Sequence, residues 1–170
     1  RSHVNTGVWI AVLIAFLAIF SMTRRPSTWV LSPRGAMSSI SLSVGVVVLL
    51  WLLITSAYRA QQIPIIILAP AAGWLRFAIG HLIMAGAIES WLRGFAFSAL
   101  ADSVGVGGAI ALTTLLSVLL QTGLPPEAYA WAMCTGVAFG LIRARTGNVL
   151  GPIAGHALGN VLISAITAIR

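Results

Sequence analysis

The sequence predicts an all-α fold, a polytopic bundle of about six transmembrane helices. Hydrophobic residues make up 59% of the 170 residues and charged residues only 8%, whereas an ordinary soluble domain has about a quarter charged residues. The apolar residues form continuous runs, without the alternation expected of a membrane β-barrel. Helices also satisfy their own backbone groups in lipid. The length suits one transmembrane domain, residues 1–170, with the lipid bilayer as its first partner.

Six apolar runs are the expected spans. The first is shorter than the roughly 20 residues that a span needs, unless residues 4–7 extend it. Because its basic residues follow the run, it differs from a signal peptide and we expect it to be retained. A proline-punctuated stretch, residues 59–70, separates the second run from the third. The runs are residues 8–22, 40–58, 73–100, 107–120, 129–142 and 149–169.

The charges predict a topology rather than a nucleic-acid site. The net charge is +7, and all ten basic residues are arginines. Most lie at the ends of apolar runs, where they orient helices and contact anionic lipid head groups. We therefore expect no nucleic-acid partner. The positive-inside rule places the loops 23–38 and 143–148 in the cytoplasm. We expect a multi-pass protein of the plasma (inner) membrane.

The third apolar run contains polar residues that are unusual for a span. An ionisable group inside a span costs several kcal/mol unless it is paired or faces a polar cavity. Glu89 and Arg93 are four residues apart, which places them on one helix face, either as a structural ion pair or as part of a site. His81 lies two turns earlier on nearly the same face, as a packing residue or a further site residue.

The sixth run has a polar pair of its own. His156 and Asn160 are four residues apart and share a helix face, where they either bond another helix or belong to a site. Gly151, Gly155 and Gly159 repeat at the same spacing. This stripe of glycines predicts close approach of another helix on a neighbouring face.

Other catalytic and binding patterns are missing from the sequence. Two histidines and one carboxylate that need not meet are a poor metal site, since metal binding needs three or more ligands. There is no Ser-His-Asp arrangement, glycine-rich phosphate loop or CxxC motif, and the one cysteine, Cys134, excludes a disulfide framework. We expect no bound metal and no cofactor.

Three segments together resemble the CPBP family of CAAX prenyl endopeptidases and bacteriocin-processing and immunity proteins of bacteria. They are ESWLRGF at residues 89–95, GVAFGLIRARTG at residues 136–147 and PIAGHALGN at residues 152–160. The resemblance covers about residues 73–169, and two further spans precede it in residues 1–60. It implies a helix bundle around a polar cavity. There a glutamate and a histidine activate water, while a second histidine and an asparagine stabilise the oxyanion.

The family's first motif, Glu-Glu-x-x-x-Arg, is incomplete here. An ungapped match places Arg93 on the arginine, Glu89 on the second glutamate and Ile88 on the first, which the family uses to activate water. Matching Glu89 to the first glutamate would need a one-residue deletion in a helix, which rotates all that follows by about 100°.

The second family motif, Phe-x-x-x-His, corresponds best to residues 117–121, where Gln121 replaces the histidine. Glutamine cannot act as a base, whereas His156 and Asn160 match the oxyanion positions. Loss of a general base alone costs about 10² to 10⁴ in rate.

Three functions remain open at this point. The first is a catalytically impaired pseudoprotease that acts as partner or scaffold of another membrane protein or complex, or holds a lipidated or membrane peptide. The second is an active intramembrane endopeptidase of CAAX type with a shifted base, Glu89 or His81. The third is a small transporter or channel subunit, for which the polar residues are few.

Overall fold

The computed structural model describes residues 33–60, 65–67, 74–120, 126–164 and 166–168, which are almost entirely helical. The expected first span, residues 8–22, and Gln121 lie outside the described residues. In chain order the elements are α2 (Pro33–Ala60), β1 (Ile65–Ile67), α3 (Trp74–Glu89), η1 (Ser90–Ala96), α4 (Phe97–Leu119), α5 (Pro126–Thr146), α6 (Leu150–Ser164) and β2 (Ile166–Ala168). The all-helical class is confirmed, apart from the short strand pair.

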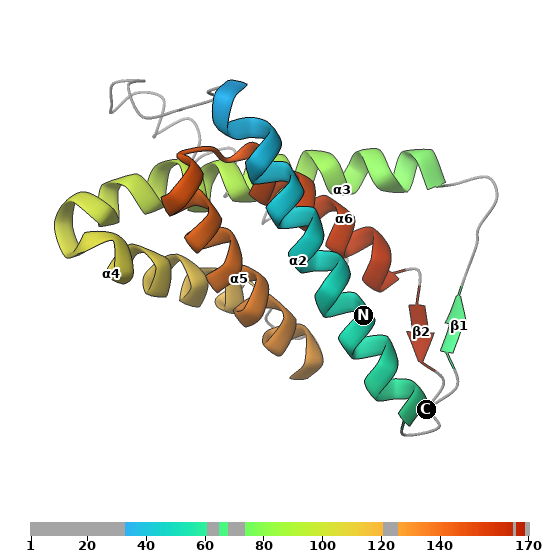
Figure 1. The fold of residues 1–170 in the computed structure, drawn as a ribbon. Coiled ribbons are helices and arrows are strands. Elements are labelled where there is room, and N and C mark those ends of the chain that lie inside the picture. Colours follow the sequence, from blue (N-terminus) through green and yellow to red (C-terminus); the bar gives the residue numbers. More distant parts are fainter. Residues whose placement is uncertain (1–32, 61–64, 68–73, 121–125, 165, 169–170) are drawn as a thin grey trace, which may run out of the picture.

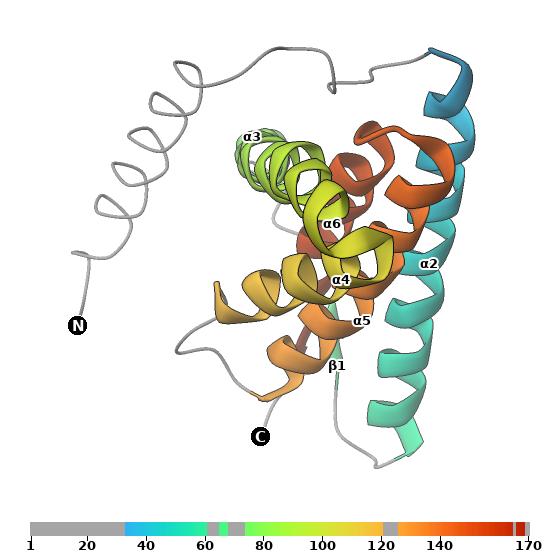
Figure 2. The same ribbon diagram turned by 90° about the vertical axis from the view of Figure 1, so that its left-hand side faces the viewer.

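Helices α5 and α6 form the middle of the bundle (Figures 1 and 2). Helix α2 packs on one side of them, against both α5 and α6. On the other side α3 packs on α6, and α4 packs on α5. The apolar core lies between α2, α5 and α6, around Val47, Phe139 and Ile142. The polar residues Glu89, Arg93 and His156 of the family resemblance come together on the side of α5 and α6 that faces α3 and η1.

The segment from α3 to α4 is a helical hairpin. Gly105 has φ 78° and ψ 169°, a backbone conformation that is essentially restricted to glycine. At this residue the chain reverses. The part of α4 after Gly105 therefore runs back beneath the continuous helical stretch made of α3, η1 and the start of α4 (Figure 1). The reversal falls between the third and fourth apolar runs, as their separation in the sequence predicts.

A tight turn connects α5 to α6. Gly147 has φ 66° and its N–H donates to the Arg143 carbonyl at 2.9 Å, so it ends α5 as a left-handed C-terminal glycine. Asn148 then caps α6, because its Oδ1 accepts the N–H of Leu150 at 2.8 Å. The Arg-Thr-Gly segment noted in the sequence is therefore a helix stop followed at once by a helix start.

The glycine stripe of α6 packs on α2, as its spacing predicts. An added Cβ at Gly155 would lie 2.9 Å from Cβ of Ser43, and one at Gly159 would lie 3.6 Å from Val47. A Cβ at Gly151 would overlap the backbone of Ser39. Each step of four residues along α6 is matched by a step of four residues in the same direction along α2. The two helices therefore run parallel in close contact. Small residues permit such an approach in membranes.

Glycines also allow close packing of α5 against α4. A Cβ at Gly136 would lie 2.9 Å from Cγ2 of Thr114, and one at Gly140 would lie 3.1 Å from Ile110. The pairing runs in opposite directions along the two helices, so they are antiparallel. Both central helices thus use glycines to bring a neighbour close.

The span count is only partly supported. Among the described residues, two stretches are long and apolar enough to cross a membrane, Gly35–Ala57 and Leu75–Leu119. The second bends back at Gly105, and α6 contributes the shorter apolar segment Leu150–Ile163. The expected runs 107–120 and 129–142 lie in helices, but the count of about six spans stays a prediction.

The sixth run differs from its prediction at its C-terminal end. Helix α6 ends at Ser164, and Ile166–Ala168 pairs antiparallel with Ile65–Ile67. Both segments contain β-branched residues, which favour strands. A single helix through residue 169 was therefore the wrong expectation.

Candidate functional site

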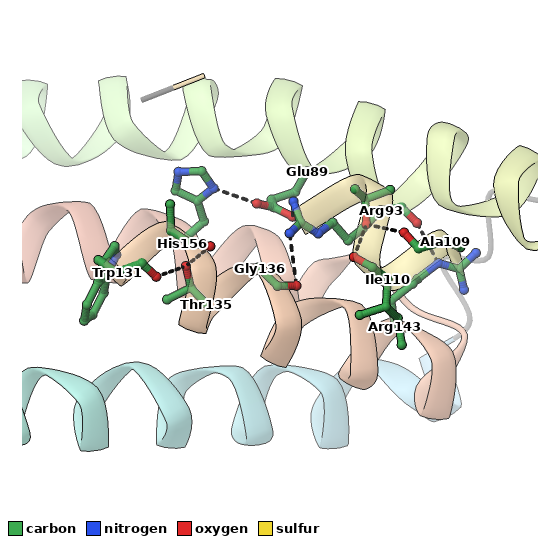
Figure 3. A network of polar contacts seen from close by, with 11 residues as sticks. Glu89, Arg93, Ala109, Ile110, Trp131, Thr135, Gly136, Arg143 and His156 are labelled. Atoms are coloured by element: carbon green, nitrogen blue, oxygen red, sulfur yellow. Dashed lines mark hydrogen bonds and ion pairs between the residues drawn. The ribbon is translucent and has the colours of Figure 1, made fainter. Parts of the chain in front are cut away.

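A buried polar cluster lies where the end of α3, η1, α5 and α6 meet (Figure 3). Glu89 is 1% exposed and Arg93 is fully buried. Oε1 of Glu89 lies 2.7 Å from Nδ1 of His156 on α6. Residues 67 positions apart in the sequence thus form one direct contact. The resemblance had named all three residues, and the structure brings all three together.

The Glu89–Arg93 ion pair expected from the spacing is present. Nη1 of Arg93 lies 3.4 Å from Oε2 of Glu89, although the two atoms do not form a hydrogen bond. The contact is therefore electrostatic rather than a bidentate fork. In a low-dielectric interior this attraction compensates part of the cost of burying both charges.

The carboxylate of Glu89 determines the orientation of His156. Oε1 of Glu89 holds the ring through Nδ1 of His156, and in this contact an ionised carboxylate would accept the hydrogen bond and Nδ1 would donate it. The His156 side chain is 15% exposed, which makes it the least buried member of the trio.

Arg93 also bonds the backbone of α5. Its Nη2 donates to the carbonyl oxygen of Gly136 at 3.1 Å. Gly136 has no side chain to block this approach, since a Cβ there would lie 3.3 Å from that Nη2. A glycine of the second family-like segment thus admits the arginine of the first.

A π-helical turn carries Arg93. The N–H of Phe97 donates to the carbonyl of Leu92, five residues earlier, instead of to that of Arg93 as in an α-helix. The carbonyl oxygen of Arg93 instead accepts the Nε–H of Arg143 at 2.8 Å. Such turns inside α-helices occur frequently at functional sites.

The other predicted residues have different positions. Asn160 lies one turn beyond His156, half-buried, and its side chain makes no hydrogen bond within the described part of the chain. Ile88 is half-buried beside Glu89. His81 packs edge-on against Phe77, with ring centroids 4.3 Å apart. Gln121 lies outside the described residues.

Arg143 is the residue that sequence reasoning missed. It was interpreted as a topology signal at a helix end, yet it is 8% exposed. Besides the Arg93 carbonyl it reaches Oγ of Ser98 at 3.5 Å and covers the Phe97 ring at 5.9 Å. Its spacing of seven residues from Gly136 was the available signal, since that spacing returns to the same helix face.

The comparison with protein families decides the assignment. The family model for "Type II CAAX prenyl endopeptidase Rce1-like" proteins matches residues 70–162, which is more than half of the chain. The chain belongs to this family. The resemblance seen in the three sequence segments is thus confirmed. No curated protein and no solved structure matches the chain.

Glu89 and His156 are the members of the described cluster that could ligate a metal ion, whereas a metal centre of the usual kind needs three or more ligands. No group of three or more His, Cys, Asp or Glu side chains that could hold an ion occurs among the residues that the structure describes. The cluster itself contains a carboxylate, an imidazole and a guanidinium, from Glu89, His156 and Arg93.

Proposed function

We propose that this CAAX-protease-like membrane protein is catalytically impaired and acts as a partner or scaffold of another membrane protein or complex. One observation supports this above others: both oxygens of Glu89 face protein partners, Arg93 and His156. At the two positions that the family uses to activate water, the chain has Ile88 and Gln121. Isoleucine and glutamine have no basic group at neutral pH.

The retained cluster gives the scaffold its rigidity. The Glu89–Arg93 pair still connects four helical elements through its contacts with His156 and Gly136, and removing one charge alone would be costly. Exposed apolar side chains on α2 and α3, such as Leu49, Leu53, Leu75 and Ile83, suit contact with lipid or with a neighbouring membrane helix.

The first experiment measures cleavage of prenylated peptides by the purified protein in lipid nanodiscs. We expect no cleavage above that of the Glu89→Gln variant. Cleavage that is lost in both Glu89→Gln and His156→Ala would contradict the proposal. Restoring the family residues with Ile88→Glu and Gln121→His supplies the positive control for the fold and the assay.

Partner binding is tested by co-purification from native membranes. We expect a second membrane protein to be recovered in a constant ratio with the wild-type chain. A chain that is recovered alone from the mildest detergent upward would argue against a scaffold.

A second candidate, an active endopeptidase, is favoured by one feature of the geometry. The Glu89–His156 hydrogen bond orients the imidazole as an acidic partner does in catalytic dyads and triads. Nε2 of His156 could then take a proton from water as the resulting hydroxide adds to a peptide carbonyl. In this candidate the base is His156 with Glu89 behind it, which differs from the shifted base expected from the sequence, Glu89 or His81. The same cleavage assay decides between the two functions.

For localisation we propose the plasma (inner) membrane, with the arginine-rich segments 23–38 and 143–148 in the cytoplasm. They were expected to be loops, but residues 33–38 belong to α2 and residues 143–146 to α5. Two contacts support a common side for these segments. A Cβ at Gly35 would lie 2.6 Å from the Thr146 carbonyl oxygen, and Oγ of Ser39 donates to the Asn148 carbonyl at 3.4 Å. Labelling of single cysteines at residues 36 and 145 in intact cells should show equal protection, and labelling of one residue alone would exclude this topology.

A further inference from the structure

Two arginines exchange hydrogen bonds between η1 and α5 (Figure 3). The Nη2 group of Arg93, on η1, donates to the Gly136 carbonyl of α5 at 3.1 Å. The Nε–H of Arg143, on α5, donates to the Arg93 carbonyl of η1 at 2.8 Å. We call this pair of hydrogen bonds the arginine clasp. Both guanidinium groups belong to buried residues.

The arginine clasp coincides with the π-helical turn. In an α-helix the Phe97 N–H would bond the Arg93 carbonyl, but here it bonds the Leu92 carbonyl. Arg143 supplies a donor to the Arg93 carbonyl at that place. A buried carbonyl without a donor is costly, so the π-helical geometry depends on a donor from outside the helix. Arg143 also contacts the residues just after the turn, Phe97 and Ser98.

The π-helical turn also bears on the orientation of Glu89. Glu89 is the residue immediately before η1, and a π-helical turn changes the helical phase between the segments on either side of it. Glu89 contacts His156 across the α3–α6 interface and Arg93 within η1, so its carboxylate connects the turn to α6. We propose that Arg143 is a positioning residue, which holds η1 in π-helical form and thereby sets the Glu89–His156 contact. This role is independent of whether the chain cleaves peptides.

The test observes His156 directly by NMR of protein labelled with ¹⁵N-histidine in nanodiscs. A histidine Nδ1–H that donates to a buried carboxylate exchanges slowly with water and resonates far downfield, and His156→Gln assigns the signal. We expect the signal in the wild type and its loss in Arg143→Ala. Arg145→Ala is the matched control on the same helix turn, because Arg145 is exposed, and it should leave the signal unchanged.

A second control separates positioning from general stability. Val47 is fully buried in the core beside α6, so Val47→Ala should lower the melting temperature while it preserves the His156 signal. Should Arg143→Ala fail to fold, Arg143→Lys decides. A lysine can donate to the Arg93 carbonyl but has no planar group to lie over Phe97, so we expect the signal to persist with severalfold faster solvent exchange.

Three results would overturn the proposal. The first is an unchanged His156 signal in a folded Arg143→Ala or, where that variant does not fold, an unchanged exchange rate in Arg143→Lys. The second is equal loss of the signal in Val47→Ala, which would make it a measure of stability alone. The third is absence of the signal from the wild type, because the contact that Arg143 is said to set would then not exist.

Discussion

The interface between α2 and α6 is made of small uncharged residues, whereas the interface between η1 and α5 is made of buried arginines. In the first interface, Gly151 lets Ser39 of α2 approach α6, and Gly155 does the same for Ser43. The stabilising energy there is van der Waals packing. In the second, Arg93 and Arg143 bond backbone carbonyls of the opposite element. The first interface depends on volume, and the second depends on charge and on hydrogen-bond partners. The two therefore respond to different substitutions.

The largest effect is expected at the charged interface. Arg93→Met leaves the buried carboxylate of Glu89 without its ion-pair partner, and breaking a buried pair costs about 3–5 kcal/mol. We expect a corresponding loss of unfolding free energy, measured by denaturant titration in detergent. The double variant Glu89→Gln/Arg93→Met removes both charges and should be more stable than Arg93→Met. A double variant that is no more stable than Arg93→Met would show that this interface does not depend on charge pairing.

At the α2–α6 interface the matching change is Gly151→Ala. The added methyl group would overlap the Ser39 backbone, and overpacking of this kind costs about 1–3 kcal/mol. Gly45→Ala on α2 is the control, because nothing lies within 4 Å of a Cβ there, and it should cause no loss. Equal stability of the two variants in thermal unfolding would contradict the close approach of α2 and α6.

The hairpin at Gly105 tests the geometry that brings α4 back onto α5. Alanine at φ 78° and ψ 169° is strained by about 1–3 kcal/mol, so Gly105→Ala should lower the melting temperature. Gly107→Ala, two residues away and in open space without a positive φ, should not. A melting temperature that falls equally in both variants would argue against a reversal at residue 105.

The smallest effect is expected at the start of α6. Asn148→Ala removes the capping oxygen that accepts the Leu150 N–H, a change that costs about 1 kcal/mol. Asn148→Ser keeps a capping oxygen and should recover most of the loss in the same melting experiment. If serine is no better than alanine, the cap is not what Asn148 contributes.

The two interfaces also differ in how far the sequence predicts them. The spacing of Gly151, Gly155 and Gly159 predicts a close helix contact, because a four-residue repeat maps directly onto one helix face. That α2 is the partner was not predictable, since Ser39 and Ser43 are ordinary residues in an apolar run. The Glu89–Arg93 pair followed from spacing in the same way.

The charged interface was harder to predict because a π-helical turn changes the phase of the helix and has no simple sequence pattern. Arg143 lies at the end of an apolar run, where an arginine equally well marks topology. The family resemblance named Glu89 and His156 as site residues, but neither it nor the periodicity predicted their direct contact. The strand pair was missed because the three isoleucines from Ile65 to Ile67 are as apolar as the neighbouring spans.

The most direct test of the central proposal is the rate at which the wild-type protein in nanodiscs cleaves a prenylated peptide, compared with Glu89→Gln. We predict equal background rates, because Ile88 and Gln121 occupy the positions that would activate water and the Glu89 carboxylate is held by Arg93 and His156. A wild-type rate well above that of Glu89→Gln would contradict the proposal and establish an active endopeptidase.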